Sequence, residues 1–337
     1  MSAAGGDLGP RVAGGLQRLG RDGAGCRPLA GDASVRRFCR LFLADGPTEI
    51  LMDTGTRFEE AGDPFCLTAR FLREMGLPVP EILGVDARSG LVLLEDLGGT
   101  MLEDRGADEP LYEAGVDLVA ELQALDPERL PQELPAKHLF FDREKLLWEM
   151  HFFHRHFFSG LLGRTLPSAE EKRLQGFYVS LCGQVADLRP RVFCHRDFHS
   201  RNLMVRDGGL VMVDFQDARL GPEAYDLVSL LRDCYVELEP GLEARLLRRY
   251  LHRRGAAGGE AAFRVGYELT ALQRGIKAAG TFSFQASARG NRRYLAALPL
   301  TARHIGRAFD ALPEYGAAAR ILLPCLTETV QKKAGRQ

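Results

Sequence analysis

The sequence predicts an α+β protein with two lobes, in which a small, mainly β lobe precedes a larger helical lobe. Strand-like segments surround one helical pattern in the first hundred or so residues, and helical patterns dominate the rest of the chain. A polar loop between two short apolar segments interrupts the helical part near residue 200. We therefore assign residues 27–97 to the small lobe and 98–330 to the larger one. Residues 1–26 are expected to form a flexible segment with one short helix, and 331–337 a tail.

The composition is that of a globular protein with a sizeable core. The chain has 337 residues, of which 45% are hydrophobic and 26% charged. Its formal net charge of −1 gives no general attraction to nucleic acid or anionic lipid, and no apolar run approaches the ~20 residues of a membrane span. The seven cysteines are scattered, without CxxC spacing, and the first residues lack the pattern of a secretion signal. We expect a cytoplasmic protein with reduced thiols and neither nucleic-acid nor membrane partners.

The small lobe is predicted to contain four strands and one helix. Residues 34–43 and 48–54 have the pattern of a hairpin around the turn ADGP at 44–47. Apolar residues at helical spacing predict a helix over 64–76, which ends at Gly76, the residue type most common just beyond a helix. Residues 78–86 and 91–99 predict two further strands.

The larger lobe is predicted to be mainly helical. Residues 108–126 have a 3.6-residue apolar period, whereas 126–137 contain three prolines and are predicted to be a loop. Further helices are expected at 142–158, 169–188, 224–238, 241–254, 261–279 and 291–311. The arginines of the helix at 241–254 are expected to lie on a solvated face. Short strands are expected at 191–195 and 209–215, on either side of the polar loop.

The polar loop carries the chemistry. Its sequence, HRDFHSRN at residues 195–202, matches the pattern HRDxxxxN of kinase catalytic loops, and Asp214 starts the next turn, at the end of the second predicted strand. Phosphoryl transfer depends on positioning and on neutralising phosphate charge, so it needs few reactive groups. Asp197 is the candidate to accept the proton of the attacking hydroxyl. Asn202 and Asp214 are candidates to bind Mg²⁺, which prefers oxygen ligands.

Two other interpretations of this loop are less favoured. An exposed polar loop with chance spacing does not explain the two flanking apolar strands or the position of Asp214. A zinc site built from Cys194, His195 and His199 is also disfavoured, because adjacent residues on a strand point to opposite sides and no second ligand cluster follows. Kinase chemistry is the interpretation that accounts for all of these positions.

The chain resembles the aminoglycoside-phosphotransferase-like kinases, which have a protein-kinase-like fold, from GDAS at residue 31 to the helices past 300. Three longer strings, HRDFHSRNLM, VDFQDARLGPEAYDLVSLLRDCY and LQRGIKAAGTF, are similar to the anomeric sugar kinases of bacterial cell-wall recycling. Those enzymes phosphorylate N-acetylmuramate and N-acetylglucosamine at carbon 1. The resemblance implies ATP and Mg²⁺ as cofactors and a small sugar as the substrate.

The sequence departs from the kinase pattern in the nucleotide-binding half. The loop that should cover the phosphates has no GxGxxG, and Gly31 and Ser34 are its candidates for phosphate contact. The next strand has Met52 near the place of the ATP-binding lysine, and the following helix lacks the partner glutamate. Arg36 or Arg37 is the candidate replacement for the missing positive charge. Backbone groups from Glu95 to Leu97 are expected to meet adenine at the hinge.

Acceptor recognition is assigned to the larger lobe, over the catalytic loop. The candidates for polar contacts with the sugar are His199, Arg201, Arg274 and Lys277. Three functions compete: an amino-sugar 1-kinase, an antibiotic kinase of the same fold, and a non-catalytic nucleotide-binding module. The near-neutral charge and the basic segment LQRGIK disfavour polycationic antibiotics. The intact aspartates and asparagine of the loop disfavour a module without activity.

Overall fold

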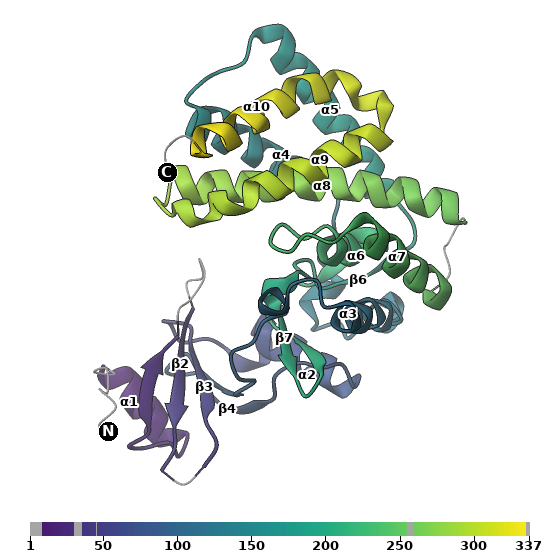
Figure 1. Ribbon diagram of the computed structural model, residues 1–337. Helices are drawn as coiled ribbons and strands as arrows, with labels where there is room; N and C mark the ends of the chain where they lie inside the picture. The colour runs from purple at the N-terminus through teal and green to yellow at the C-terminus, as the bar shows by residue number, and fades with distance from the viewer. Residues whose placement is uncertain (1–8, 30–35, 45, 255–258, 335–337) are drawn as a thin grey trace.

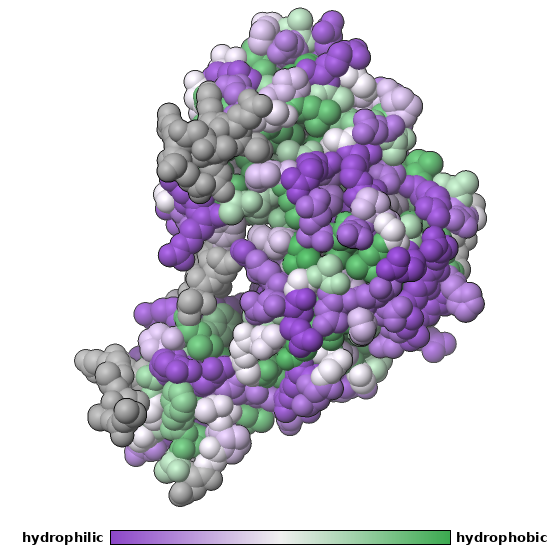
Figure 2. All heavy atoms as spheres, viewed as in Figure 1, coloured by the Kyte–Doolittle hydropathy of each residue, from purple (hydrophilic) through white to green (hydrophobic). Residues whose placement is uncertain are grey.

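The computed structural model describes residues 9–29, 36–44, 46–254 and 259–334, and these form the two predicted lobes (Figure 1). The small lobe contains the N-terminal sheet, and the helices of the larger lobe are stacked beside and above it in this view. The molecular surface is hollowed between the two lobes (Figure 2). Within the described residues, no helix is long and apolar enough to cross a membrane.

The small lobe is built on an antiparallel sheet. Its described strands are β1 (Gly25–Pro28), β2 (Arg37–Phe42), β3 (Glu49–Asp53), β4 (Ile82–Asp86) and β5 (Leu91–Glu95), in the order β1-β2-β3-β5-β4. The predicted hairpin and the two later strands are confirmed, and β1 was not predicted. The predicted helix is also confirmed as α2 (Pro64–Glu74). It begins after Asp63, whose carboxylate accepts a hydrogen bond from the backbone N–H of Cys66 at 2.9 Å.

The two faces of this sheet have different partners. On the outer face, helix α1 (Pro10–Arg18) contributes Leu16 to a small core with Leu41 and Leu51 (Figure 1). Arg11 and Arg18 of this helix pair with strand carboxylates at 2.7 Å each. The short helix expected within residues 1–26 is thus present as α1, and among the described residues it packs on the sheet of the small lobe. Its single short apolar stripe gave no sign of a binding partner in the sequence.

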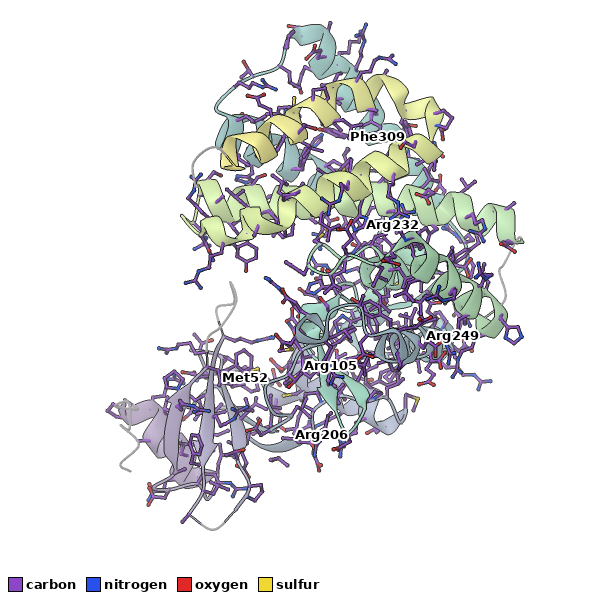
Figure 3. The ribbon with its side chains drawn as sticks, viewed as in Figure 1. Met52, Arg105, Arg206, Arg232, Arg249 and Phe309 are labelled. Carbon is purple, nitrogen blue, oxygen red and sulfur yellow. The ribbon has the colours of Figure 1, made fainter. Side chains whose placement is uncertain are left out.

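The inner face joins the main core of the molecule. Met52 and Val92, from β3 and β5, belong to the same buried cluster as Phe65 of α2 and Phe215 of the larger lobe. Figure 3 shows Met52 on the side of the sheet that faces the larger lobe. Because this core is continuous, residues on the inner face of the small lobe pack against the loop that carries Asp214.

The larger lobe is helical, as predicted. Its described helices are α3 (Glu109–Leu122), α4 (Arg143–His154), α5 (Ser168–Asp187), α6 (Ala224–Leu231), α7 (Pro240–Arg254), α8 (Glu260–Ser287), α9 (Leu298–Ala311) and α10 (Gly316–Ala334). Helix α4 continues as a π-helix over Arg155–Leu162. Helix α6 ends at Leu231 rather than at residue 238, and α8 extends to Ser287 rather than to 279. Helix α10 was not predicted.

Two short strand pairs carry the polar loops. Strand β6 (Arg191–Cys194) pairs with β9 (Arg219–Pro222), and β7 (Leu203–Arg206) pairs with β8 (Gly209–Met212), both in antiparallel register. The loop at 195–202 runs from β6 to β7, and the loop that begins at Val213 runs from β8 to β9. The two loops therefore leave neighbouring strands and are held side by side.

Candidate active site

The loop at 195–202 is fixed by buried carboxylates from the helical lobe. Asp226, fully buried on α6, accepts hydrogen bonds from the backbone N–H groups of His195 at 2.6 Å and Arg196 at 3.0 Å. These bonds hold Arg196 at a φ of +83°, a conformation that non-glycine residues rarely adopt. Asp233 accepts a hydrogen bond from the backbone N–H of Ser200 at 2.9 Å. The loop is therefore held at both ends by groups that cannot move without leaving a buried carboxylate unpaired.

Asp197 lies at the centre of this loop and is paired with a cation. Lys277 of α8 donates from Nζ to Asp197 Oδ1 at 2.8 Å. Burial favours the neutral form of Asp197, but the positive charges of Lys277 and Arg196 outweigh that effect and hold its pKa well below the usual range. The carboxylate is thus ionised and available to accept a hydrogen bond from an incoming hydroxyl.

Asn202 and Asp214 lie on the two neighbouring loops. The amide nitrogen of Asn202 donates to the carbonyl oxygen of Asp197 at 2.9 Å, so its side-chain oxygen is the atom left to bind a cation. The backbone N–H of Val213 donates to the carbonyl oxygen of Asn202 at 3.0 Å, which ties the loops together. Asp214 has a φ of +65°, and its carboxylate accepts a hydrogen bond from the Gln216 amide at 2.5 Å.

These residues fit a magnesium site completed by phosphate. Among the described residues, no group of three or more histidine, cysteine, aspartate or glutamate side chains is arranged to hold a metal ion. An amide oxygen and one carboxylate are nevertheless the kind of donors that Mg²⁺ accepts when substrate phosphates and water supply the others. When bound, such an ion neutralises phosphate charge. In such a site the chain would hold these two oxygens beside Asp197.

The structure separates the four predicted acceptor residues. Lys277 contacts Asp197, as described above. Arg201 forms two hydrogen bonds with Glu103, at 2.6 and 2.8 Å, and its guanidinium lies 3.7 Å from the centre of the Tyr235 ring. Arg274 is buried behind the loop, with 4% of its surface exposed, and His199 is half-buried with its ring edge against Tyr235. Arg201 and Arg274 therefore contact other parts of the fold, and neither lines the cavity beside Lys277.

That cavity lies between α4, α8 and the catalytic loop and has a volume of about 160 Å³. It is lined by Trp148, Glu149, Phe152, Arg196, Lys277 and Thr281. Helices α4 and α8 approach closely because Gly280 has no side chain: a Cβ there would lie 2.7 Å from the Cα of Phe153. Trp148 was not predicted as a site residue, because an aromatic-rich helix is more often a core helix. Arg196 was not predicted either, although it lies inside the motif.

The nucleotide candidates also divide into separate groups. Gly31 and Ser34 lie outside the described residues. Arg37 pairs with Asp53 at 3.3 Å, whereas the guanidinium of Arg36 lies 5.7 Å from the ring centre of Phe65. Glu95, at the end of β5, forms an ion pair with Arg206 of the larger lobe, and Figure 3 labels this arginine on the β7–β8 hairpin. Leu97 is buried where the chain crosses between lobes.

A small sheet lobe joined to a helical lobe, with an aspartate, an asparagine and a second aspartate on adjacent loops, defines a kinase-type phosphotransferase with an alcohol acceptor. The sequence pattern of the phosphotransferase enzyme family matches residues 25–264, and the chain belongs to that family. It is 33% identical to the N-acetylmuramate/N-acetylglucosamine kinase of Neisseria meningitidis serogroup B, over 82% of this chain and 84% of that protein. The protein of the same name from Pseudomonas aeruginosa is also 33% identical, over 88% of this chain and 87% of the relative.

Solved structures with low sequence identity confirm the predicted fold class. The gentamicin complex of APH(2")-IIa superposes with a TM-score of 0.61 at 12% identity, covering 88% of this chain and 96% of the other. Macrolide 2'-phosphotransferase type I gives a TM-score of 0.60 at 18% identity, covering 90% and 98% of the two chains. At this identity the likeness describes the two-lobed architecture alone, and it assigns no acceptor.

Proposed function

We propose that this protein is an ATP- and Mg²⁺-dependent kinase that phosphorylates N-acetylmuramate or N-acetylglucosamine at the hydroxyl of carbon 1. The observation that carries the proposal is the ion pair between Lys277 and Asp197 at a small cavity. Lys277 lines this cavity and its partner Asp197 is ionised, which supports entry of the acceptor hydroxyl from the cavity toward Asp197. The names of the relatives support the choice of sugar.

The proposed reaction assigns one task to each polar group. Asp197 accepts the proton of the sugar hydroxyl as that oxygen attacks the terminal phosphate of ATP, and the bond from that phosphate to ADP breaks. Asn202 and Asp214 would hold Mg²⁺, which would neutralise phosphate charge. The hydroxyl at carbon 1 shares its carbon with the ring oxygen, so it is more acidic than an ordinary alcohol. A carboxylate base of low pKa suits such an acceptor.

The charges at the cavity favour an anionic acceptor over a cationic one. Two cations, Arg196 and Lys277, and one carboxylate, Glu149, line it, so the lining has an excess of positive charge. All three are paired: Arg196 with Asp217 at 2.7 Å, Lys277 with Asp197 at 2.8 Å, and Glu149 with Lys145 at 3.5 Å and the Gln273 amide at 3.0 Å. N-acetylmuramate carries a lactyl carboxylate, which a lysine can bind. Aminoglycosides are polycations and need an acidic pocket. We therefore expect no useful turnover of kanamycin-like compounds.

The experiment that tests the proposal uses a sugar whose carbon 1 is blocked. Purified protein is incubated with ATP, Mg²⁺ and either free N-acetylglucosamine or its methyl glycoside, and the products are identified by phosphorus NMR and mass. We expect a sugar 1-phosphate from the free sugar and no product from the glycoside. Equal phosphorylation of the two sugars rules out the anomeric assignment and points to a kinase of an ordinary hydroxyl.

Lys277→Met should discriminate between the two sugars. Because only N-acetylmuramate offers a carboxylate, we expect its KM to rise about 10-fold or more relative to that of N-acetylglucosamine, the cost of one charge-assisted hydrogen bond. Turnover of both sugars should also fall, since Asp197 loses its partner. Steady-state kinetics with both sugars make the test.

Arg201→Met is the matched control, because Arg201 pairs with Glu103 instead. If Arg201→Met changes the ratio of the two KM values as much as Lys277→Met does, Lys277 does not bind the sugar carboxylate.

A further inference from the structure

The small lobe contains no lysine, although kinase templates place an ATP-binding lysine on its third strand. The first lysine of the chain is Lys137, in the larger lobe. On β3, Met52 is 1% exposed and belongs to the main core. The facing helix α2 presents Phe65, Cys66, Ala69 and Leu72 to that core, and no glutamate. Neither member of the usual lysine–glutamate pair is therefore present, and a cation for the nucleotide must come from elsewhere.

The contact of Arg36 with Phe65 places it on the same face of the sheet as Met52. In the pairing of β2 with β3, Phe38 lies opposite Met52, and both side chains contact the main core. Arg36 directly precedes β2, and its guanidinium lies over the ring of Phe65, which belongs to that same core. Arg37 lies opposite Asp53 and pairs with it, alongside Arg11 of the outer helix. Of the two candidate arginines, Arg36 therefore faces the catalytic loops and Arg37 faces away.

An aromatic stack connects Arg36 to the metal-binding aspartate. The guanidinium of Arg36 lies over the Phe65 ring, 5.7 Å from its centre. Phe65 stacks on Phe215, with 5.2 Å between ring centres and 18° between ring planes. Phe215 directly follows Asp214 in the chain.

We propose that Arg36 binds the phosphates of the nucleoside triphosphate in place of the missing lysine, and that Phe65 holds its guanidinium in place of the missing glutamate. A guanidinium stacks on aromatic rings and binds phosphate through two parallel hydrogen bonds, which an ammonium does not do. A ring also attracts the cation without adding a negative charge that repels phosphate. The proposal rests on the proposed function only in taking a nucleoside triphosphate as the phosphate donor.

Calorimetry with a series of nucleotides tests this role. Wild-type protein and Arg36→Met are titrated with AMP, Mg-ADP and a non-hydrolysable Mg-ATP analogue. Loss of a charge-assisted contact should weaken Mg-ADP and the ATP analogue about 10- to 100-fold, and AMP much less. Arg36→Lys should recover part of the loss. Arg27→Met is the matched control, because Arg27 also stacks on a phenylalanine, Phe42, at 5.3 Å. Arg27 lies on β1, away from the catalytic loops. This variant should bind all three nucleotides as the wild type does.

Three outcomes overturn the proposal. They are unchanged binding of Mg-ADP by Arg36→Met, an equal loss for all three nucleotides, and a loss as large in Arg37→Met. The first shows that Arg36 does not contact phosphate, the second that it supports the fold, and the third that the charge is not specific to this face of the sheet. Because the readout is nucleotide binding, it stands even if no sugar is phosphorylated, and that failure would concern the proposed function alone.

Discussion

Asp197→Asn should lower the turnover number by a factor of about 10²–10⁴, the usual cost of losing a general base. The amide keeps the shape of the side chain but cannot take the proton of the acceptor hydroxyl. Binding of Mg-ATP should change little, because Asp197 pairs with Lys277 and its backbone carbonyl, rather than its carboxylate, contacts Asn202. Single-turnover measurements with saturating sugar, together with nucleotide calorimetry, separate the two effects.

The matched control for this variant is Asp217→Asn. Asp217 Oδ2 accepts a hydrogen bond from Arg196, one of the two arginines of the loop, at 2.7 Å, but its side chain is 59% exposed. We expect it to change the turnover number by no more than a few-fold, as is typical of exposed ion pairs. If Asp197→Asn retains half of the wild-type turnover when chemistry limits the rate, Asp197 is not the proton acceptor.

Asp214→Ala should weaken Mg²⁺-dependent nucleotide binding and lower the turnover number together, each by about 100-fold or more, because it removes the only charged ligand that we assign to the metal. Nucleotide affinity measured across a range of Mg²⁺ concentrations gives the test. In the variant, affinity should lose most of its dependence on Mg²⁺.

Alanine at this position also carries a conformational cost, since Asp214 has a φ of +65°. Asp207→Ala supplies the matching control. Asp207 has a φ of +50°, lies in the turn between β7 and β8, and is almost fully exposed, so it shares the backbone cost and has no part in the site. A metal dependence that survives in Asp214→Ala, or disappears equally in Asp207→Ala, counts against the assigned role.

The short loops could be predicted because their chemistry restricts the residue types over a few positions. Asp197, Asn202 and Asp214 are separated by fixed spacings, and two apolar strands hold the loops that carry them. The contact between Lys277 and Asp197 joins residues 80 positions apart, and no local pattern shows which helix will reach the loop. The sequence could therefore identify the reaction while leaving the acceptor residues unresolved among several cations.

The predicted end of helix α6 is wrong because a polar residue beyond Leu231 turns inward. The apolar pattern after residue 224 continues through Tyr235 to Leu238, which predicted a helix to 238. In the structure α6 ends at Leu231, because Asp233 turns its carboxylate to the backbone N–H groups of Ser200 and Tyr235. The contacts that hold the catalytic loop therefore end the helix before its apolar pattern ends.

The arginines of α7, at the surface, also have partners that the sequence pattern does not predict. Their spacing predicted a solvated face, and they are indeed partly exposed. In the structure they also pair with carboxylates of α3: Arg245 with Glu109 at 2.8 Å, and Arg249, labelled in Figure 3, with Asp117 at 2.7 Å. Those carboxylates lie more than a hundred positions earlier in the chain. Periodicity within one helix shows which residues share a face, but it does not show what covers that face.

Met52 also determines which covalent reagents can react beside the nucleotide. Probes that label kinases by acylating an amine need a nucleophilic nitrogen on the third strand. Here that strand offers a thioether with 1% of its surface exposed, which acyl donors do not modify. Its own characteristic reaction is oxidation to a polar sulfoxide, which the surrounding core would resist. An amine-directed kinase inhibitor would consequently lack its usual anchor in this protein, and a covalent ligand selective for it must be built around a different nucleophile.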